Sequence, residues 1–450
     1  MFIYKGKTIK SIGLFGYGKS NKGIYEFFNT LPEDFRFILR SDHQKDTEGA
    51  KFEKVLFGDV ALKRINEDIL FLSPSVRRDK KELAFAEKRG VILSSDADFF
   101  LSLTKSDVYA ITGSDGKSTT TKLSAAMLSE SYARAVACGN IGEAMTPHLS
   151  DGDNCAYVTE LSSFQLTYMK PKSQRALITN ITKNHLNWHS SFDEYINAKR
   201  NVFENARERI INFDCEISRS FAKDYRIFSV FSHRLSEVEL KKAVEAELYV
   251  TLNDGYITVS GEKMLKISDI RVKGTHNVEN FMAAIAMSYG LADKQLILNT
   301  AKEFTGLRHR CEFVGERDGI KYYDSSIDSS PKRTSATLKT FDERVIVILG
   351  GRSKGLEFSD LIPTLKQKAK AVVLMGECAE EIANTLSRDP TFTTDIPYTI
   401  RACLSDALEY AASIARHGDS VLLSPAATSY DEFKNFEERG DAFCNLIHGL

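Results

Sequence analysis

The chain lacks long apolar runs, an excess of one charge and paired cysteines, and each absence excludes a class of protein. No apolar run approaches the ~20 residues that a membrane-spanning helix needs, and the N-terminus has no signal-peptide layout. The formal net charge of -1 provides no basic surface for nucleic acid. The 7 cysteines are scattered and include no C-x-x-C pair, which argues against a disulfide framework and a zinc site. We therefore expect a cytoplasmic protein that binds neither membranes nor nucleic acid.

The length of the chain and its alternation of short strands with helical stretches predict three α/β domains in series. A chain of 450 residues is too long for one core, and 42% hydrophobic with 27% charged residues is ordinary for a globular protein. We expect a Rossmann-like N-terminal domain over 1–105, a central P-loop ATPase-like domain over 106–304 and a Rossmann-like C-terminal domain over 305–450.

Each domain is defined by its short apolar strands. In the first domain a glycine-rich turn over 16–23 follows the first strand. In the central domain, alternation around Asn253-Asp254-Gly255 predicts a β-hairpin in a small antiparallel subsheet, and 274–291 is typical of a helix. The other strands are expected at 11–15, 35–39, 69–73, 91–93, 107–112, 155–161, 176–182, 345–349, 371–375 and 420–423.

The stretch AITGSDGKSTTTKL, residues 110–123, resembles a phosphate-binding loop that is two residues short. The usual motif is G-x-x-x-x-G-K-[ST], but Ile111 stands five positions before Gly116. A predicted strand precedes the loop and an apolar-periodic stretch over 118–128 follows it. Its N–H groups would meet phosphates at a helix N-terminus, with Lys117 on the terminal phosphates and Ser118 or Thr119 on Mg²⁺.

Polar residues at the ends of two neighbouring strands extend this site. Glu160 ends one predicted strand and His185 follows the next. Ligands of open parallel sheets gather outside the carboxyl ends of the strands, and a carboxylate there suits Mg²⁺. Lys199, in a helical stretch, reads on its own as a surface lysine.

Several stretches together resemble the Mur ligases, the family that builds the peptide stem of peptidoglycan. The resemblance covers nearly the whole chain. The matching stretches are TGSDGKST at 112–119, GNIG at 139–142, ELSSFQL at 160–166, NITKNH at 180–185, AKRNVFENA at 198–206, GTHNVEN at 274–280, TGLRHR at 305–310 and YYDSS at 322–326. The ending LSPAATSYDEFKNFEERG, 423–440, is similar to the members that add D-glutamate.

The resemblance implies an ATP-dependent amide ligase in peptidoglycan precursor synthesis. Its substrates would be UDP-N-acetylmuramoyl-L-alanine, D-glutamate and ATP, joined through an acyl phosphate with release of ADP and phosphate. Two Mg²⁺ ions would neutralise the meeting anions. Ser118 and Glu160 would hold one ion and His185 the other, and Lys199 would carry a CO₂-derived carbamate as an anionic ligand.

The resemblance also assigns the remaining site residues. The expected catalytic residues are Lys117, Glu160, His185, Lys199 and Arg310. The expected ATP contacts are Gly113, Ser114, Asp115, Gly116, Lys117, Ser118, Thr119, Asn277, Asn280, Arg310 and Asp324. The expected UDP-substrate contacts are Gly18, Ser20, Ser73, Asn140, Gln165 and His185. The expected D-glutamate contacts are Lys354, Ser429, Phe436 and Ser329.

The chain departs from the family pattern in four places. After Asp324 the pattern has Ser-Lys-Ala-Thr, but here Ser326 stands for the lysine and Asp328 for the threonine, so we expect Ser329 or Ser330 to contact the acceptor. The other departures are Arg40-Ser41-Asp42 for an acidic-Thr-Arg run, Lys183-Asn184 for acidic residues, and Asp115 for asparagine.

Three other interpretations compete with D-glutamate ligation. One is another Mur ligase or a folylpolyglutamate synthetase, against which the ending at 423–440 argues. Another is a nucleotide-binding relative without ligase activity, whose acceptor site was lost through Ser326 and Asp328. The third, a P-loop switch or kinase, is disfavoured by the short loop. A monomer is the default expectation.

Overall fold

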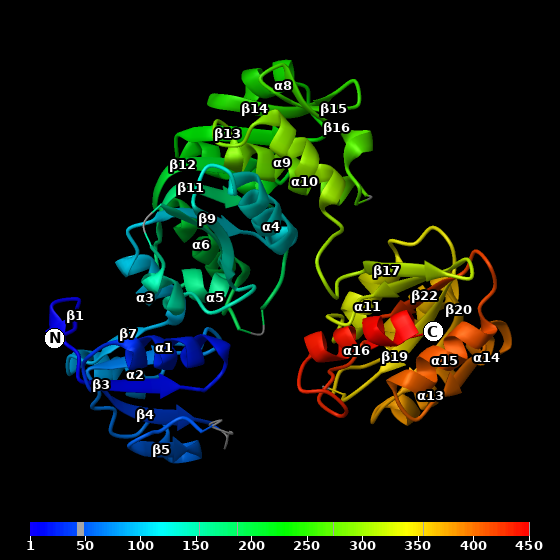
Figure 1. Ribbon diagram of the computed structural model, residues 1–450, viewed down its shortest axis with the longest axis horizontal. Helices are drawn as coiled ribbons and strands as arrows, with labels where there is room; N and C mark the ends of the chain where they lie inside the picture. The colour runs from blue at the N-terminus through cyan, green and yellow to red at the C-terminus, as the bar shows by residue number, and fades with distance from the viewer. Residues whose placement is uncertain (43–48, 153, 187, 273, 354, 450) are drawn as a thin grey trace. The chain divides into compact units, whose positions relative to one another are not determined.

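The computed structural model describes residues 1–42, 49–152, 154–186, 188–272, 274–353 and 355–449. The chain forms two compact units, Met1–Phe304 and Thr305–Leu450 (Figure 1). Unit 1 contains two large sheets and unit 2 contains one, each covered by helices. No helix in the described ranges is long and apolar enough to cross a membrane.

The first sheet of unit 1 is entirely parallel, in the order β5-β4-β3-β6-β7. Its strands are β3 (Ser11–Phe15), β4 (Arg36–Ser41), β5 (Lys54–Phe57), β6 (Ile69–Leu72) and β7 (Ile92–Ser94), and its helices are α1 (Lys19–Thr30), α2 (Lys81–Lys88) and α3 (Asp96–Leu103). A small hairpin of β1 (Ile3–Tyr4) and β2 (Lys7–Thr8) precedes it. The order reverses between β4 and β6 around β3, which leaves a crevice position at the glycine-rich turn after β3.

The second sheet of unit 1 has nine strands in the order β16-β15-β14-β13-β12-β11-β8-β10-β9. They are β8 (Asp107–Thr112), β9 (Arg134–Gly139), β10 (Cys155–Glu160), β11 (Lys172–Ile178), β12 (Asn205–Asn212), β13 (Ile227–Ser232), β14 (Ala246–Asn253), β15 (Tyr256–Val259) and β16 (Glu262–Lys266). The main helices are α4 (Lys117–Leu128), α5 (Ser163–Leu166), α6 (Phe192–Arg200), α7 (Glu216–Ser220), α8 (Glu237–Ala243), α9 (Thr275–Ser288) and α10 (Lys294–Glu303).

The hairpin predicted around Asn253-Asp254-Gly255 is confirmed, because β14 and β15 pair antiparallel with Asn253 opposite Tyr256. Both turn residues have positive φ, 48° for Asp254 and 76° for Gly255, as a two-residue hairpin turn requires. Strand β14 pairs parallel with β13 at the edge of the parallel sheet. Strands β15 and β16 then extend this edge by antiparallel pairing.

One strand lies four residues earlier than predicted. The strand expected at 176–182 is β11, which spans Lys172–Ile178, so residues 179–182 form a loop. Polar residues from Lys172 to Arg175 concealed the first half of this strand from a search for apolar runs. Residues 179–182 instead bind the phosphate loop, as described below.

Unit 2 contains a six-stranded sheet in the order β17-β18-β22-β19-β20-β21, with β17 antiparallel and the others parallel. The strands are β17 (Glu312–Arg317), β18 (Ile320–Asp324), β19 (Val345–Gly350), β20 (Ala369–Met375), β21 (Tyr398–Ile400) and β22 (Ser420–Leu423). The helices are α11 (Pro331–Leu338), α12 (Ile362–Lys368), α13 (Ala379–Ser387), α14 (Pro390–Asp395), α15 (Leu404–Ile414) and α16 (Phe436–Gly449). The carboxyl ends of β18, β22 and β19 therefore lie side by side at one edge.

Candidate active site

The phosphate loop joins β8 to α4 through two glycines, Gly113 and Gly116, at which any larger residue would be strained. Gly116, the residue before α4, has φ 77°, and Gly113 has φ 153°. A Cβ on Gly113 would lie 1.9 Å from Thr179 Oγ1, and one on Gly116 would lie 2.4 Å from Asn280 Oδ1. The loop thus brings its backbone close to two neighbouring elements at the start of a 12-residue helix, where N–H groups favour an anion.

The loop after β11 holds the phosphate loop in place. Thr179 Oγ1 donates to the carbonyl of Asp115 at 2.6 Å, and the Asp115 N–H donates to Asn180 Oδ1 at 2.9 Å. The Ser114 N–H donates to the Asn180 carbonyl at 2.8 Å. These contacts fix the backbone of Asp115 and leave its side chain exposed. The unusual carboxylate of the loop therefore faces solvent in this structure.

Ser118 and Glu160 lie in direct contact beneath the loop. Ser118 Oγ donates to Glu160 Oε2 at 2.6 Å, and Asn140 Nδ2 donates to Glu160 Oε1 at 2.8 Å. Glu160 is only 2% exposed at the end of β10, which neighbours β8. A hydroxyl and a carboxylate side by side are the hard oxygen ligands that Mg²⁺ prefers, so this pair fits a magnesium ion. Lys117 Nζ donates to the Ser114 carbonyl at 2.8 Å, which keeps its ammonium over the loop.

Lys199 is buried, contrary to the surface position that its sequence context alone indicates. It is 2% exposed, and its Nζ donates to the Gly113 carbonyl at 2.6 Å and lies 4.7 Å from the centroid of the Tyr195 ring. No carboxylate among the described residues forms an ion pair with it. Burial, and then the nearby charge of Lys117, hold the pKa of Lys199 well below its usual value. Its amine is therefore neutral far more readily than that of an exposed lysine.

His185 and the two asparagines of α9 flank the loop in unit 1. His185 is exposed in the loop after β11, with φ 54° and its ring 5.0 Å from that of Phe164. Asn280 is buried, and its Oδ1 accepts from Thr120 Oγ1 of α4 at 3.3 Å. Asn280 Nδ2 donates to Asn277 Oδ1 at 3.4 Å, so both asparagines lie together beside the first turn of α4.

Two residues predicted to contact the UDP substrate, Asn140 and Gln165, are engaged within the protein. Asn140 bonds Glu160, as described above, and Gln165 caps α5, with its Oε1 accepting from the Ser162 N–H at 2.9 Å. Both support the strand end that carries Glu160, so their contact with the substrate stays a prediction. Thr119 is buried in the first turn of α4.

The predicted UDP residues lie at the glycine-rich turn of the first sheet. Gly18 precedes α1, Ser20 lies in its first turn, and Ser73 Oγ, after β6, donates to the Phe15 carbonyl at 2.9 Å. Sequence reasoning missed Asn21, which is buried and whose Nδ2 donates to the Gly16 carbonyl at 2.8 Å. An asparagine within the turn G-x-G-x-x-N is the signal that could have identified it.

Arg40, which breaks the family pattern after the second strand, has a structural role. Its Nε donates to Glu67 Oε1 at 2.7 Å, and both side chains are 3% exposed. Its Nη1 also donates to the Ala61 carbonyl at 2.7 Å. The guanidinium therefore points into the domain and is not available to a ligand.

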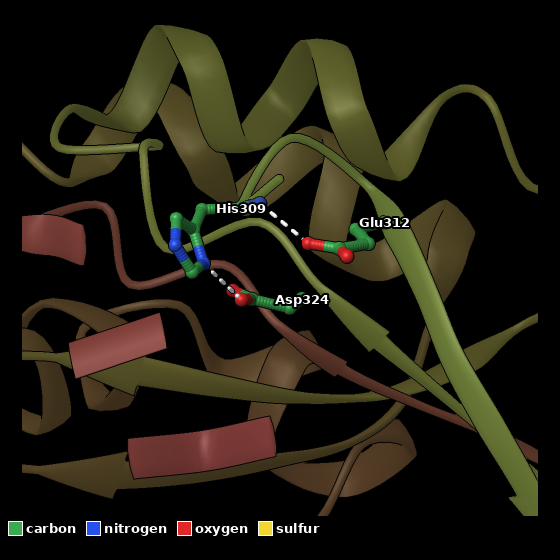
Figure 2. A group of neighbouring side chains, drawn as sticks. All are labelled: His309, Glu312 and Asp324. Carbon is green, nitrogen blue, oxygen red and sulfur yellow. Dashed lines mark hydrogen bonds and ion pairs between the residues drawn. The ribbon is translucent and has the colours of Figure 1, made fainter. Parts of the chain in front are cut away.

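In unit 2, Asp324 holds the turn that carries Arg310. Asp324 is 0% exposed, and its Oδ2 bonds His309 Nδ1 at 2.7 Å while Oδ1 accepts from the Ser326 N–H at 2.8 Å. Glu312 Oε2 accepts from the His309 N–H at 2.8 Å (Figure 2). Figure 2 shows the imidazole directed at Asp324 and the Glu312 carboxylate directed at the backbone of His309. Arg310, the next residue, is exposed.

Asp324 has a structural task in unit 2 besides the predicted contact with ATP. Both carboxylate oxygens are engaged inside unit 2, so its direct contact with ATP stays a prediction. Ligand atoms of His309, Glu312 and Asp324 lie within 4.8 Å of one another, but each of them already serves a hydrogen bond of the turn. Sequence reasoning missed His309, although it is adjacent to Arg310 in the matched stretch.

The predicted acceptor residues cluster at the carboxyl ends of β18 and β22. Ser429 is buried after β22, Ser329 is half-buried after β18, and the Phe436 carbonyl accepts from Ser326 Oγ at 2.8 Å. Lys354 lies outside the described residues. Asp328 is buried, and its Oδ2 accepts from Thr337 Oγ1 at 2.7 Å and from Ser424 Oγ at 2.8 Å.

Comparison with known proteins finds the same family over both units. The Mur ligase middle domain matches residues 111–288, and the Mur ligase glutamate ligase domain matches residues 309–427. The UDP-N-acetylmuramoylalanine–D-glutamate ligase of Ruminiclostridium cellulolyticum is 37% identical over 98% of this chain and 97% of its own. The enzymes of the same name from Acetivibrio thermocellus and Clostridium perfringens are 36% and 35% identical, over 98% and 99% of this chain and 97% of theirs.

Solved structures share the fold at lower identity. The UDP-N-acetylmuramate–alanine ligase of Thermotoga maritima superposes with a TM-score of 0.61 at 19% identity, over 98% of this chain and 100% of its own. A pseudomurein peptide ligase type C of Methanothermus fervidus superposes with a TM-score of 0.55 at 18% identity, over 98% and 99%. At such identities the likeness concerns the fold alone.

Proposed function

Since the chain belongs to the Mur ligase family, we propose that it joins D-glutamate to UDP-N-acetylmuramoyl-L-alanine at the expense of ATP, in peptidoglycan synthesis. Relatives at 33–37% identity over nearly the whole chain carry this activity in their names. The observation in the molecule that supports it best is the contact of Ser118 with Glu160 directly behind the phosphate loop. Such a pair would hold a magnesium ion beside the terminal phosphates of a nucleotide bound at the loop.

The reaction brings together two anions, the alanyl carboxylate and the triphosphate of ATP. An oxygen of the alanyl carboxylate forms a bond to the γ-phosphorus as the bond to ADP breaks. The D-glutamate amine then forms the C–N bond as the C–O bond to phosphate breaks, and a proton leaves to solvent. Lys117 would neutralise charge on the transferred phosphoryl group, and the loop N–H groups would align it.

Bound Mg²⁺ would supply Lewis acidity and further charge neutralisation. Ser118 and Glu160 would hold one ion, and His185 would hold a second. Lys199 contributes as an anion only after modification: its neutral amine adds to CO₂, the new C–N bond forms and a proton is released. The lowered pKa of Lys199 supports this step, because only the neutral amine is nucleophilic.

The other contacts are proposed by position. We expect Asn277 and Asn280 at the nucleoside of ATP, beside the loop they already adjoin. Arg310 would contact the phosphates, with Asp324 acting through the His309 turn. Residues Gly18, Ser20 and Ser73 would bind the uridine diphosphate, and residues Lys354, Ser329, Ser429 and Phe436 would bind D-glutamate.

A direct assay tests the proposal. The purified protein is mixed with Mg·ATP, UDP-N-acetylmuramoyl-L-alanine and one amino acid at a time, and phosphate release and product mass are followed. We expect turnover with D-glutamate and at least tenfold less with L-glutamate or D-aspartate, because a site that pairs both carboxylates penalises a misplaced one. Turnover with a different amino acid and none with D-glutamate would refute the assignment.

A further inference from the structure

Arg439, in the first turn of α16, is a buried cation that the reaction described above does not use. It is 1% exposed and is the largest fully buried side chain among the described residues. Its Nε donates to Ser326 Oγ at 2.9 Å, and its Nη2 donates to the Ser326 carbonyl at 2.9 Å and to the Ala427 carbonyl at 3.2 Å. Its Nη1 donates to the Thr428 carbonyl at 3.1 Å. All its partners are neutral oxygens.

These partners come from loops that are far apart in sequence. Ser326 follows β18, whereas Ala427 and Thr428 follow β22, the adjacent parallel strand. The loop after β19 closes around the same group, since a Cβ on Gly351 would lie 3.0 Å from Arg439 Nη1. Arg439 thus connects the carboxyl ends of three neighbouring strands, where α/β sheets bind their ligands.

The loop after β22 has a backbone conformation that its own residues do not favour. Ala426 has φ 58°, a left-handed conformation that a non-glycine residue rarely adopts. The adjacent carbonyl of Ala427 accepts from Arg439, so the guanidinium fixes a strained segment. Strain of this kind persists where surrounding contacts over-determine it, and it concentrates at binding sites.

We propose that Arg439 is the positioning residue of the amino-acid acceptor site, joining the Ser326–Ser330 and Ala427–Ser429 loops so that their hydroxyl and N–H groups meet the acceptor carboxylates. This inference rests on the proposed function. Ser329 lies three residues from the Ser326 contact, and Ser429 directly follows Thr428. The guanidinium is too deeply buried to touch the acceptor, so it acts through these loops.

Arginine is suited to this task and lysine is not. A planar guanidinium offers five N–H donors in a fixed fork, whereas an ammonium offers three around a point. Burial lowers the pKa of Arg439 to about 10, so the group stays charged at neutral pH. Its charge is balanced at a distance by Asp431, Asp324 and Asp328.

Substitution of Arg439 by lysine tests the inference. In Arg439→Lys, we expect the KM for D-glutamate to rise about tenfold or more while the KM for ATP changes less than about twofold, because the phosphate loop of unit 1 is untouched and Asp324 keeps its bond to His309 beside Arg310. Arg317→Met is the matched control: Arg317 Nη1 also donates to α16, at the Ile447 carbonyl 2.8 Å away, but Arg317 pairs with Ile320 at the amino end of β18, opposite to the carboxyl end that leads to Ser326. It should leave both KM values unchanged.

A second readout does not depend on turnover. Hydrogen exchange of 325–330 and 426–429 should quicken in Arg439→Lys relative to the wild type and Arg317→Met, with exchange in β19 and β20 preserved. Parallel changes in both KM values, or unchanged exchange in the two loops, would overturn the inference. A wild type that never turns over D-glutamate would refute the proposed function instead, whatever the loops show.

Discussion

Lys199 in unit 1 and Arg439 in unit 2 are both buried cations that contact no carboxylate among the described residues, yet they solve the same electrostatic problem differently. Lys199 gives two hydrogen bonds, a short one to the Gly113 carbonyl and a long one of 3.4 Å to Thr112 Oγ1, whereas Arg439 gives four to Ser326, Ala427 and Thr428. Burial depresses the pKa of Lys199 far below its usual value, but that of Arg439 only to about 10.

The difference follows from the chemistry of the two side chains. A buried ammonium that exchanges its water for few hydrogen bonds is destabilised relative to the neutral amine, so the pKa of the lysine falls. A delocalised guanidinium keeps its charge, because its several hydrogen bonds offset the free-energy cost of desolvation. A buried lysine therefore becomes a reactive amine, whereas a buried arginine becomes a fixed part of the scaffold.

The strongest test of this comparison is Lys199→Met. We expect kcat to fall at least about a hundredfold, as when one preorganised electrostatic group is removed from an active site. Folding should become more favourable in CO₂-depleted buffer at pH 7, by roughly 1 kcal/mol, since a buried group that is costly to charge disappears. Phosphate release and thermal unfolding measure the two effects.

The sign of the stability effect is fixed by the direction of the pKa shift. Between the lowered pKa of Lys199 and its usual value of 10.5, the unfolded chain binds more protons than the folded one. Wild-type stability should therefore rise with pH across that interval, and the methionine variant should lack this rise. Asn197→Met, at an exposed position two residues earlier in α6, is the control and should keep both activity and stability near wild type. A methionine variant less stable than wild type at pH 7 would contradict the comparison.

The next largest effect is expected beside Arg439, at Gly440. A Cβ there would lie 2.1 Å from His309 Nδ1 and 2.7 Å from Asp324 Oδ2. Gly440→Ala should destabilise unit 2 by about 1–3 kcal/mol through overpacking, despite the gain in helix propensity. Gly449→Ala, in the same helix with nothing within 4 Å, should be neutral or slightly stabilising. Equal unfolding midpoints for the two variants would show that α16 does not need this close approach.

Local sequence predicted those features whose cause is local. The strand at 107–112 and the helix that follows are confirmed as β8 and α4, because apolar runs and a glycine-rich turn define them. Glu160 was expected at the same sheet edge as the loop, and the structure brings it to 2.6 Å from Ser118 Oγ. The turn at Asn253-Asp254-Gly255 is likewise a property of its own residues.

What could not be predicted depends on residues distant in the chain. Lys199 reads as a surface lysine because its burial comes from the Gly113 loop, 86 residues away. Arg439 meets Ser326 across 113 residues, and no periodicity in α16 indicates that contact. The matched family motif includes Arg439 but says nothing about its partners. Tertiary packing alone decides which charged residues of a helix are buried.

His309 completes the comparison as a buried cationic group that does have a carboxylate partner. Burial alone would lower the pKa of His309, but the hydrogen bond and charge of Asp324 outweigh it and the pKa is raised. A raised folded-state pKa stabilises the protein below the usual value of 6.5, and this contribution is lost as pH rises through the folded-state pKa. The effect is expected to be the smallest of the three.

The double variant His309→Asn with Asp324→Asn isolates this pair. Asparagine tolerates the φ of 62° at His309 and can offer a neutral amide near the position of Nδ1, so the contact keeps its shape without its charges. We expect the wild type to exceed the variant in unfolding midpoint most at pH 6, and the difference to shrink steadily toward pH 9. Replacing both partners avoids a lone buried carboxylate, whose own titration would otherwise obscure the result. A difference that is constant across this range would mean that the pair is held by hydrogen-bond geometry and not by charge, which would place His309 with Arg439 as scaffold.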